Sequence, residues 1–324
     1  MNHSPHQANA VVTAGLCTAV AIVLSMLGLY IPVSSLVVSW LIPLPIMYVG
    51  MKLGTRWSLI VTAGTVILSA AFFGAMSRAV TCATLALLGT AMGCCYGRGV
   101  RPVVTLFVSA LAVLLGWIGQ GLFSVLVMGV PLETISNAFF GMFEIPPDLL
   151  AQFYSGETLA QVEESARVMQ EEIRKTIYFS ALAAPVMYGW IEMSIARLVF
   201  RRLGMKDMPG LPPLSRWQMP LAAVYVYLAA IGAGMIYKGG YVLPYEAGSV
   251  LDLGLYNLGV ACSFLFLLQG ISIVWWLPER YKGIRPFRAV IVAAAFFIPL
   301  VQTFLILMGV FDMLMHYREK HQYK

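Results

Sequence analysis

Long apolar stretches in this sequence alternate with short connectors that carry most of its positive charge. Hydrophobic residues make up 60% of the 324 residues and charged residues only 11%, and a soluble core of ordinary size could not bury that much apolar surface. An apolar helix of about 20 residues crosses the ~30 Å hydrocarbon layer of a membrane. The pattern therefore predicts an all-α, polytopic transmembrane helical bundle.

Nine segments have the length and composition of spanning helices. They are residues 10–29, 34–51, 57–74, 79–97, 102–128, 176–200, 218–237, 252–277 and 287–312. The second segment is marginal, because Pro43 and Pro45 interrupt it. We therefore expect eight or nine spanning helices.

The charges of the connectors predict the side of the membrane that each one faces. Basic residues cluster in alternate connectors, as the positive-inside rule requires of cytoplasmic loops, so the N-terminus is predicted to be cytoplasmic. They are Lys52, Arg56, Arg98, Arg101, Arg197, Arg201, Arg202, Lys206, Arg216, Arg280, Lys282, Arg285 and Arg288. This distribution accounts for the net charge of +6 without nucleic acid as a partner. The basic tail with Arg318, Lys320 and Lys324 conflicts with this map, because nine crossings place it outside, whereas eight place it inside.

Residues 131–175 form a long acidic segment that is predicted to be extracytoplasmic. Eight acidic residues outnumber three basic ones there. Apolar residues from Val162 to Ile173 recur at the spacing of one helical face, and Thr158 with Gln161 fits a capping box. The segment therefore predicts one extramembrane amphipathic helix, which is either a solvated stalk or a lid or partner-docking helix over the outer face.

The best internal boundary lies in the basic connector after the sixth segment, where three prolines between residues 209 and 213 cannot continue a helix. It divides the chain into a six-helix membrane bundle over residues 1–203, which includes the acidic segment, and a three-helix extension over residues 218–324. Residues 204–217 form the cytoplasmic connector between them.

Two stripes of small residues are predicted to be helix-packing or partner-docking surfaces, since small side chains let another helix approach closely. The stripes are Gly89, Gly93 and Gly97 in one helix and Ala10, Ala14 and Thr18 in another. Packing within the chain is favoured for the glycine stripe, although a contact between subunits would produce the same spacing. The N-terminal stripe is the more exposed of the two, because such a helix often lies at the edge of a bundle.

Glu192 is the foremost functional candidate, because a carboxylate in the middle of an apolar span must face a cavity, meet a cation or stay protonated. It is interpreted as a coupling or substrate-contacting group, or alternatively as a structural group. Arg78 lies in a predicted outer connection, against the charge rule, and is either an anion contact or a snorkelling side chain. The amides inside the segments either join helices or line a polar cavity. They are Gln120, Asn257, Gln269 and Gln302, and Asp312 is interpreted as a marker of the membrane interface.

Motifs of several known chemistries are absent from the sequence. It contains no GxxxxGK[ST] nucleotide loop, no GxGxxG after a strand and no HExxH zinc motif. The four histidines lie in the tails, and the five cysteines fit helix packing better than disulfides or a metal site. We therefore expect no catalytic residues, no metal, no cofactor and no enzymatic activity.

Short motifs spread over the whole chain resemble one family. They are Leu29-Tyr-Ile-Pro32, Trp40-Leu-Ile-Pro-Leu-Pro45, Leu214-Ser-Arg-Trp217, Gln269-Gly-Ile-Ser272, and Gly309-Val-Phe-Asp312 followed by Tyr317-Arg318. In their order and spacing they resemble the YybS-like family of bacterial multi-pass membrane proteins. The resemblance implies a location in the bacterial cytoplasmic membrane and no particular biochemical activity.

The first six segments are also similar to the substrate-binding S-components of energy-coupling-factor transporters. The similarity rests on Ala10-x-x-x-Ala14, which resembles the stripe by which such components dock on their transmembrane partner, and on the prolines before Gly50-Met-Lys-Leu-Gly54. It implies a small-molecule ligand and a separate ATPase-driven partner module, consistent with the missing nucleotide loop. The acidic segment and the last three helices depart from that pattern.

Two functions fit this sequence. In the first, an S-component-like core captures a small molecule from the outer side, and separate energising partners help to move it. The groups nearest the ligand are then predicted to be Trp40, Tyr48, Arg78, Gln120 and Glu192, and the docking stripe is predicted to be Ala10, Ala14 and Thr18. The alternative is a non-transporting membrane scaffold in cell-envelope assembly or regulation, whose acidic helix and glycine stripe contact other proteins.

Overall fold

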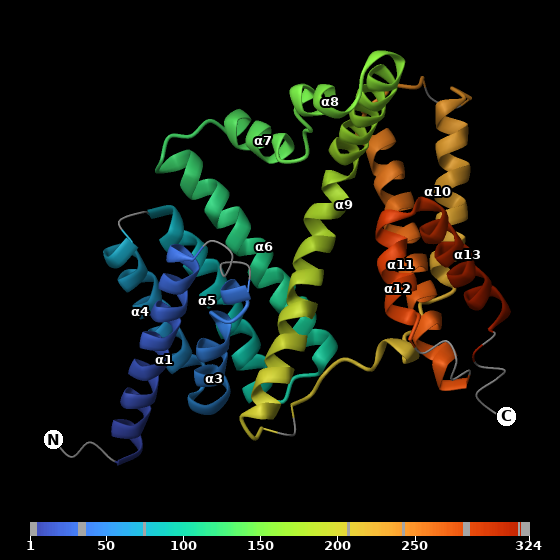
Figure 1. Cartoon of the computed structure of the whole chain (residues 1–324). Coiled ribbons are helices and arrows are strands. Elements are labelled where there is room, and N and C mark those ends of the chain that lie inside the picture. Colours follow the sequence, from blue (N-terminus) through green and yellow to red (C-terminus); the bar gives the residue numbers. More distant parts are fainter. Residues whose placement is uncertain are drawn as a thin grey trace. The chain divides into compact units, whose positions relative to one another are not determined.

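The computed structural model describes residues 5–31, 37–73, 76–205, 208–241, 244–280, 286–316 and 318. In these ranges the regular structure is helical and includes no β-strand (Figure 1), which confirms the predicted all-α class. Several residues singled out above lie outside the described ranges. They are Pro32, Lys206, Lys282, Arg285, Tyr317, Lys320 and Lys324.

The chain divides into two compact units. Unit 1 comprises Met1–Glu144 and Ala181–Leu211, and unit 2 comprises Ile145–Ser180 and Pro212–Lys324. The sequence-based division assigned the whole acidic segment to the N-terminal bundle. The structure instead groups residues 145–180 with the C-terminal helices, since the long helix that begins inside the acidic segment belongs to both units.

The helices of each unit follow one another along the chain. Unit 1 contains α1 (Pro5–Tyr30), α3 (Pro43–Leu53), α4 (Thr55–Phe73), α5 (Met76–Gly97), α6 (Pro102–Leu126), α7 (Leu132–Gly141) and the C-terminal half of α9 (Gly156–Arg202). Unit 2 contains α8 (Pro147–Phe153), the N-terminal half of α9, the 3₁₀ turn η1 (Leu214–Arg216), α10 (Ala222–Lys238), α11 (Val250–Arg280), α12 (Arg288–Phe297) and α13 (Pro299–Met315).

Five of the described helices, namely α1, α4, α5, α6 and α11, are long and apolar enough to cross a membrane. The predicted segment 34–51 and the predicted segment 218–237 correspond to shorter apolar helices, and segment 176–200 is part of α9, which is 47 residues long. The predicted segment 287–312 corresponds to two helices, α12 and α13, which meet at a bend of 110° and together form a sixth candidate span. Ile298 is extended there (φ −119°, ψ 104°), as steric contact with the ring of the following Pro299 favours.

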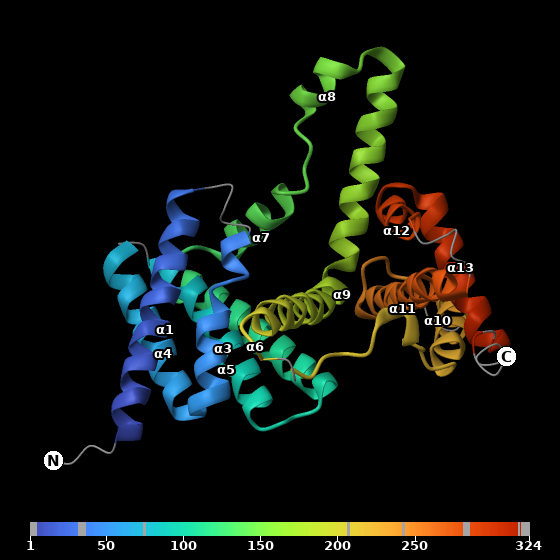
Figure 2. The same ribbon diagram turned by 60° about the horizontal axis from the view of Figure 1, so that its bottom comes forward.

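The glycine stripe of α5 packs against α3, which lies beside it (Figure 1, Figure 2). A Cβ atom on Gly89 would lie 2.6 Å from the carbonyl oxygen of Pro43, and one on Gly93 would lie 2.5 Å from that of Met47. Real side chains do not approach a backbone this closely. The two helices therefore touch along their backbones, and the stripe is filled from within the chain.

The small-residue stripe of α1 is also covered within unit 1. Ala10 and Ala14 are only 6% and 5% exposed, and Ala14 belongs to an apolar cluster with residues of α3 and α4. Thr18 faces Gly64 of α4, where an added Cβ would lie 3.4 Å from the threonine methyl group. The two alanines of this stripe are therefore packed within unit 1, and Thr18 is half-buried against α4.

The acidic segment contains the beginning of α9. The capping box places the start of this helix at Thr158. The helix instead starts at Gly156, so Thr158 lies inside it and does not cap it. Exposed ion pairs join Arg167 to Glu164 at 2.7 Å and to Glu171 at 2.8 Å. Such pairs support a solvated helix by a few tenths of a kcal/mol each, ~0.3 kcal/mol in helical hosts.

Helix α13 crosses α11 at two glycines in unit 2. A Cβ on Gly270 would overlap the carbonyl oxygen of Leu305, and a Cβ on Gly309 would overlap that of Phe266. Glycine is therefore required at both positions of this crossing. The crossing brings the end of α13 beside the middle of α11 and beside the connector that precedes α10.

Candidate functional site

Glu192 is completely buried in unit 1. It lies on the face of α9 that packs on α6, one turn after Gly189, whose missing side chain lets the helix approach Ser109 of α6. Among the described residues neither carboxylate oxygen of Glu192 has a hydrogen-bond partner. An unpaired buried carboxyl group is costly while it is charged, so Glu192 is either protonated or matched by a ligand or ion, and it stays a candidate functional position.

Aromatic side chains border the same face of α9. The ring of Trp40 stacks on that of Tyr188, with centroids 4.3 Å apart and planes 24° from parallel. Tyr188 precedes Glu192 by one helical turn, so the stacked pair lies beside the carboxyl group. Tyr48 meets Phe200 farther along α9, at a centroid distance of 6.5 Å. The structure thus brings three of the predicted ligand residues, Trp40, Tyr48 and Glu192, to one helix face.

Arg197 does not pair with Glu192. The two residues are five positions apart on α9, so their side chains point in different directions around the helix. The Arg197 guanidinium group packs against Gly210 of the connector, where a Cβ would lie 2.5 Å from Nη1. Tyr96 of α5 is close enough to Arg197 for the two to interact electrostatically. In the described part of the chain, the Tyr96 hydroxyl and the Arg197 Nε are further buried groups without a hydrogen-bond partner.

A second group of predicted residues surrounds a cavity of about 380 Å³ in unit 1, which we call the Arg78 cavity. It lies between α1, the turn before α3 and the first turns of α5, at the end of these helices that is predicted to face outward. Its walls are formed by Ser25, Gly28, Ser39, Ile42, Ser77, Arg78, Thr81, Cys82 and Leu85. The cavity therefore combines one guanidinium group with several hydroxyl groups.

Gln120 of α6 reaches the Arg78 cavity indirectly. Its Nε2 donates a hydrogen bond to the hydroxyl of Thr81 at 3.2 Å, and Thr81 lies one turn after Arg78 on α5. On the other side of the cavity, Ser39 immediately precedes Trp40. The five predicted ligand residues thus form two neighbouring groups, one around Glu192 and one around Arg78, rather than one cavity.

Unit 2 contains a buried polar network centred on Arg318, which is 1% exposed. Its Nε donates to Asp312 Oδ2 at 2.9 Å, its Nη1 donates to the Ser272 hydroxyl at 2.7 Å, and its Nη2 donates to the carbonyl of Trp217 at 2.8 Å. Gln269 Nε2 donates to the same Asp312 oxygen at 2.6 Å. The network lies beside a cavity of about 310 Å³.

The comparison with known proteins assigns the chain to a family. The model of the family described as "Predicted membrane protein (DUF2232)" matches residues 19–313. The chain belongs to this family. A relative, the uncharacterized protein YybS of Bacillus subtilis (strain 168), is 24% identical over 323 residues, which are 97% of this chain and 99% of YybS. The predicted membership of a YybS-like family is therefore confirmed.

The family assignment and the apolar helices together identify an integral, multi-pass membrane protein. No solved structure matches the chain. The similarity of the first helices to S-components therefore stays a prediction.

The Arg318 network brings the C-terminal motifs of this DUF2232 protein together in space. The four motifs Leu214–Trp217, Gln269–Ser272, Gly309–Asp312 and Tyr317–Arg318 each contribute a group to the network or to the glycine crossing beside it. Sequence reasoning treated Gln269 as an interhelical hydrogen bond and Asp312 as an interface marker, and it missed their common partner. Arg318 looked like one charge of a basic tail, and nothing in its local sequence indicates burial.

Proposed function

We propose that this protein is a membrane-embedded binding subunit for a small anionic solute, which enters unit 1 at the Arg78 cavity. The composition of this cavity carries the proposal. The Arg78 guanidinium group and the Ser77 hydroxyl are donors suited to a carboxylate or phosphate. The hydroxyls of Ser25 and Thr81 donate to the backbone carbonyls of Ala21 and Ser77 and make the wall polar. The free N–H groups in the first turn of α5 add to the positive potential there.

Glu192 is proposed to respond to the bound solute. Trp40 lies next to a wall residue of the Arg78 cavity and stacks on Tyr188, one turn from Glu192. A solute that displaces the Trp40 ring would change the surroundings of an unpaired carboxyl group, which can gain or lose a proton. This arrangement supports a coupling role for Glu192 better than a role as a direct ligand.

Movement of the solute across the membrane is proposed to require separate energising partners, because the sequence holds no nucleotide-binding loop. The α1 stripe is packed inside unit 1. A partner module would therefore dock on another surface of the protein.

The test is mass spectrometry of small molecules retained by the gently purified full chain. Arg78→Ala is compared with Arg101→Ala, which removes the same charge from an exposed position at the start of α6, outside the cavity. The proposal expects an anionic compound that is retained by the wild type and by Arg101→Ala and is depleted by Arg78→Ala. Equal retention by both variants would refute the Arg78 cavity as its site.

A scaffold role is the second candidate, and the exposed apolar side chains of the acidic region favour it. Phe139 of α7 is 44% exposed and Met142, which follows that helix, is 80% exposed. Exposed apolar groups of this kind contact lipid or another protein. Co-purification with envelope-synthesis proteins, lost on Met142→Asp and accompanied by no retained solute, would support this role over solute binding.

A further inference from the structure

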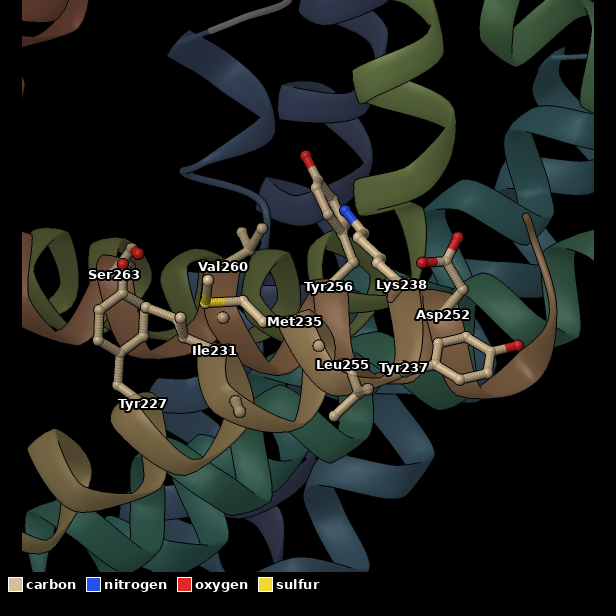
Figure 3. Close-up of a pocket in the computed structure, with 13 residues that line it drawn as sticks. Tyr227, Ile231, Met235, Tyr237, Lys238, Asp252, Leu255, Tyr256, Val260 and Ser263 are labelled. Atoms are coloured by element: carbon tan, nitrogen blue, oxygen red, sulfur yellow. The ribbon is translucent and has the colours of Figure 1, made fainter. Parts of the chain in front are cut away.

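A groove of about 410 Å³ runs between α10 and α11 in unit 2 (Figure 3). Its walls are mostly apolar and include Ile231, Leu255 and Val260. On α11 the groove extends over residues 252–263, a helical length of about 16 Å at 1.5 Å per residue. The groove is therefore long and narrow, and its shape suits a hydrocarbon chain.

Two glycines make the groove deep. Gly234 of α10 and Gly259 of α11 both line it, and a Cβ added to either one would meet no atom within 4 Å. These glycines therefore do not serve the close contact of one helix with another. They leave space between two apolar helices, and lipid chains are the molecules available to fill such space inside a membrane.

One end of the groove is polar. At this end the side chains of Lys238 and Asp252 lie near Tyr256 (Figure 3). Tyr227 and Ser263 lie at the opposite end of the groove. The polar end is formed by the last turn of α10 and the first turn of α11. It lies at the predicted outer surface of the membrane, where a lipid headgroup would be.

The polar end carries charges of both signs. Lys238 is exposed and supplies a cation, and Asp252 supplies an anion of which one oxygen accepts the Gly248 N–H at 3.0 Å. The carboxylate of Glu172 is also close to Lys238 and accepts a hydrogen bond from the Tyr256 hydroxyl. A purely anionic headgroup would meet two carboxylates here, whereas a headgroup with both charges finds a partner for each.

We propose that the groove between α10 and α11 binds an ethanolamine phospholipid. One acyl chain lies along Gly234 and Gly259, the phosphate contacts the Lys238 ammonium group, and the amine of the headgroup contacts the Asp252 carboxylate. The groups that line the groove thus match an apolar chain and a headgroup with charges of both signs. The proposal concerns unit 2 alone and does not depend on solute binding by unit 1.

The test is native mass spectrometry of the full chain after equilibration with equal amounts of phosphatidylethanolamine and phosphatidylglycerol that carry the same acyl chains. The wild type is expected to retain phosphatidylethanolamine in about fivefold excess, the discrimination that one partly exposed ion pair provides. Lys238→Ala is expected to reduce the retention of both lipids. Asp252→Asn is expected to bring the ratio of the two lipids close to one, since it removes the contact to the amine.

Filling the groove provides a matched pair of variants. Gly259→Leu places a side chain in the groove and is expected to abolish lipid retention. Gly254→Leu adds the same side chain on the same helix, at a glycine that also has nothing within 4 Å and does not line the groove, and should retain lipid as the wild type does. Should Gly259→Leu fail to fold, the two charge variants still decide the outcome.

Three results would overturn the proposal. The first is equal retention of both lipids by the wild type, and the second is equal lipid retention by Gly259→Leu and Gly254→Leu. The third is a dimer whose interface is lost in Gly259→Leu, which would assign the groove to a second copy of the chain.

Discussion

The buried Arg318 side chain is predicted to stabilise the end of the chain more than any exposed ion pair described above. The perturbation is Arg318→Ala. It removes the Nε–H that donates to the Asp312 carboxylate. It also removes the Nη donors to the Ser215 carbonyl, the Ser272 hydroxyl and the Trp217 carbonyl. The carbonyl of Trp217 keeps the Ser272 hydroxyl as a donor at 2.9 Å. Among the residues that the structure describes, the Asp312 carboxylate then keeps Gln269 alone as a donor, and one of its oxygens has no partner even in the intact network.

The magnitude follows from these lost contacts. Breaking a buried ion pair from one side costs about 3–5 kcal/mol, because the other charge stays buried without compensation. Arg318 is 1% and Asp312 8% exposed, so both charges are shielded from bulk water in the folded protein. We therefore expect Arg318→Ala to lower the free energy of unfolding by about 3–5 kcal/mol. Arg318→Lys keeps the charge but cannot reach all of these acceptors, so it should have an intermediate effect.

The assay is equilibrium unfolding of the purified full chain in mixed micelles, followed by tryptophan fluorescence, because Trp217 accepts a bond from Arg318. Asp312→Asn and the double variant that combines it with Arg318→Ala complete a double-mutant cycle. Each single variant leaves one buried charge unpaired, whereas the double variant leaves none. The double variant should therefore be less destabilised than the sum of the single variants by about 1–3 kcal/mol.

Two results would refute this reasoning. If Arg318→Ala changes the free energy of unfolding by less than about 0.5 kcal/mol, which is the range of ordinary surface substitutions, Arg318 does not hold the network together. If the single effects add without a coupling energy, Arg318 and Asp312 do not interact in the folded protein.

Four further predictions concern other parts of the molecule. Gly93→Val should greatly reduce the amount of folded protein, which thermal unfolding measures. Gly15→Val should be tolerated, because no atom lies within 4 Å of a Cβ added at Gly15. Glu192→Leu should raise the free energy of unfolding by about 1–3 kcal/mol, since it removes a buried carboxyl group without a partner, and a decrease would mean that an ion or ligand compensates this group. Hydrogen bonds from the Tyr256 hydroxyl and Lys175 hold the pKa of Glu172 below its usual value of 4.5. The stabilisation from the charged Glu172 carboxylate is therefore fully present above pH 4.5 and is lost as the pH falls through the lowered pKa. Hydrogen exchange of residues 168–176, corrected for its intrinsic pH dependence, should then increase in acid for the wild type, while Glu172→Gln should show the faster exchange already at neutral pH. A fluorescent reporter fused to the C-terminus should be active in the cytoplasm, and an active periplasmic phosphatase fusion at the same site would contradict this.

Local sequence patterns predicted the features that depend on neighbouring residues. Apolar length gave the helical membrane class, and the four-residue spacing of Gly89, Gly93 and Gly97 indicated a close helix contact. The partners of these features could not be predicted, because they lie far away in the sequence. Nothing near Arg318 indicates that the carbonyl groups of a connector about 100 residues earlier are its acceptors.

The arrangement of the candidate site was beyond prediction for the same reason. Chemical type alone selected Arg78, Gln120 and Glu192 as polar groups of a membrane interior. Only the packing of α5 against α6 and of α6 against α9 shows that Gln120 reaches Thr81 and that Glu192 belongs to a separate group. The division of unit 1 into two neighbouring polar groups therefore depends on tertiary contacts that leave no periodic signal in the sequence.

The bend between α12 and α13 bears on the side of the membrane that the basic tail faces. Helix α12 has 10 residues, a length of about 15 Å, which is half of the hydrocarbon thickness. The chain then turns at Pro299, crosses α11, and places Arg318 against Ser215 and Trp217 of the connector before α10. That connector is predicted to be cytoplasmic, so the tail and its basic residues should be on the same side, as the positive-inside rule requires. We therefore predict that the last apolar segment enters and leaves from one side, which gives eight crossings and agrees with the charges of both the connectors and the tail.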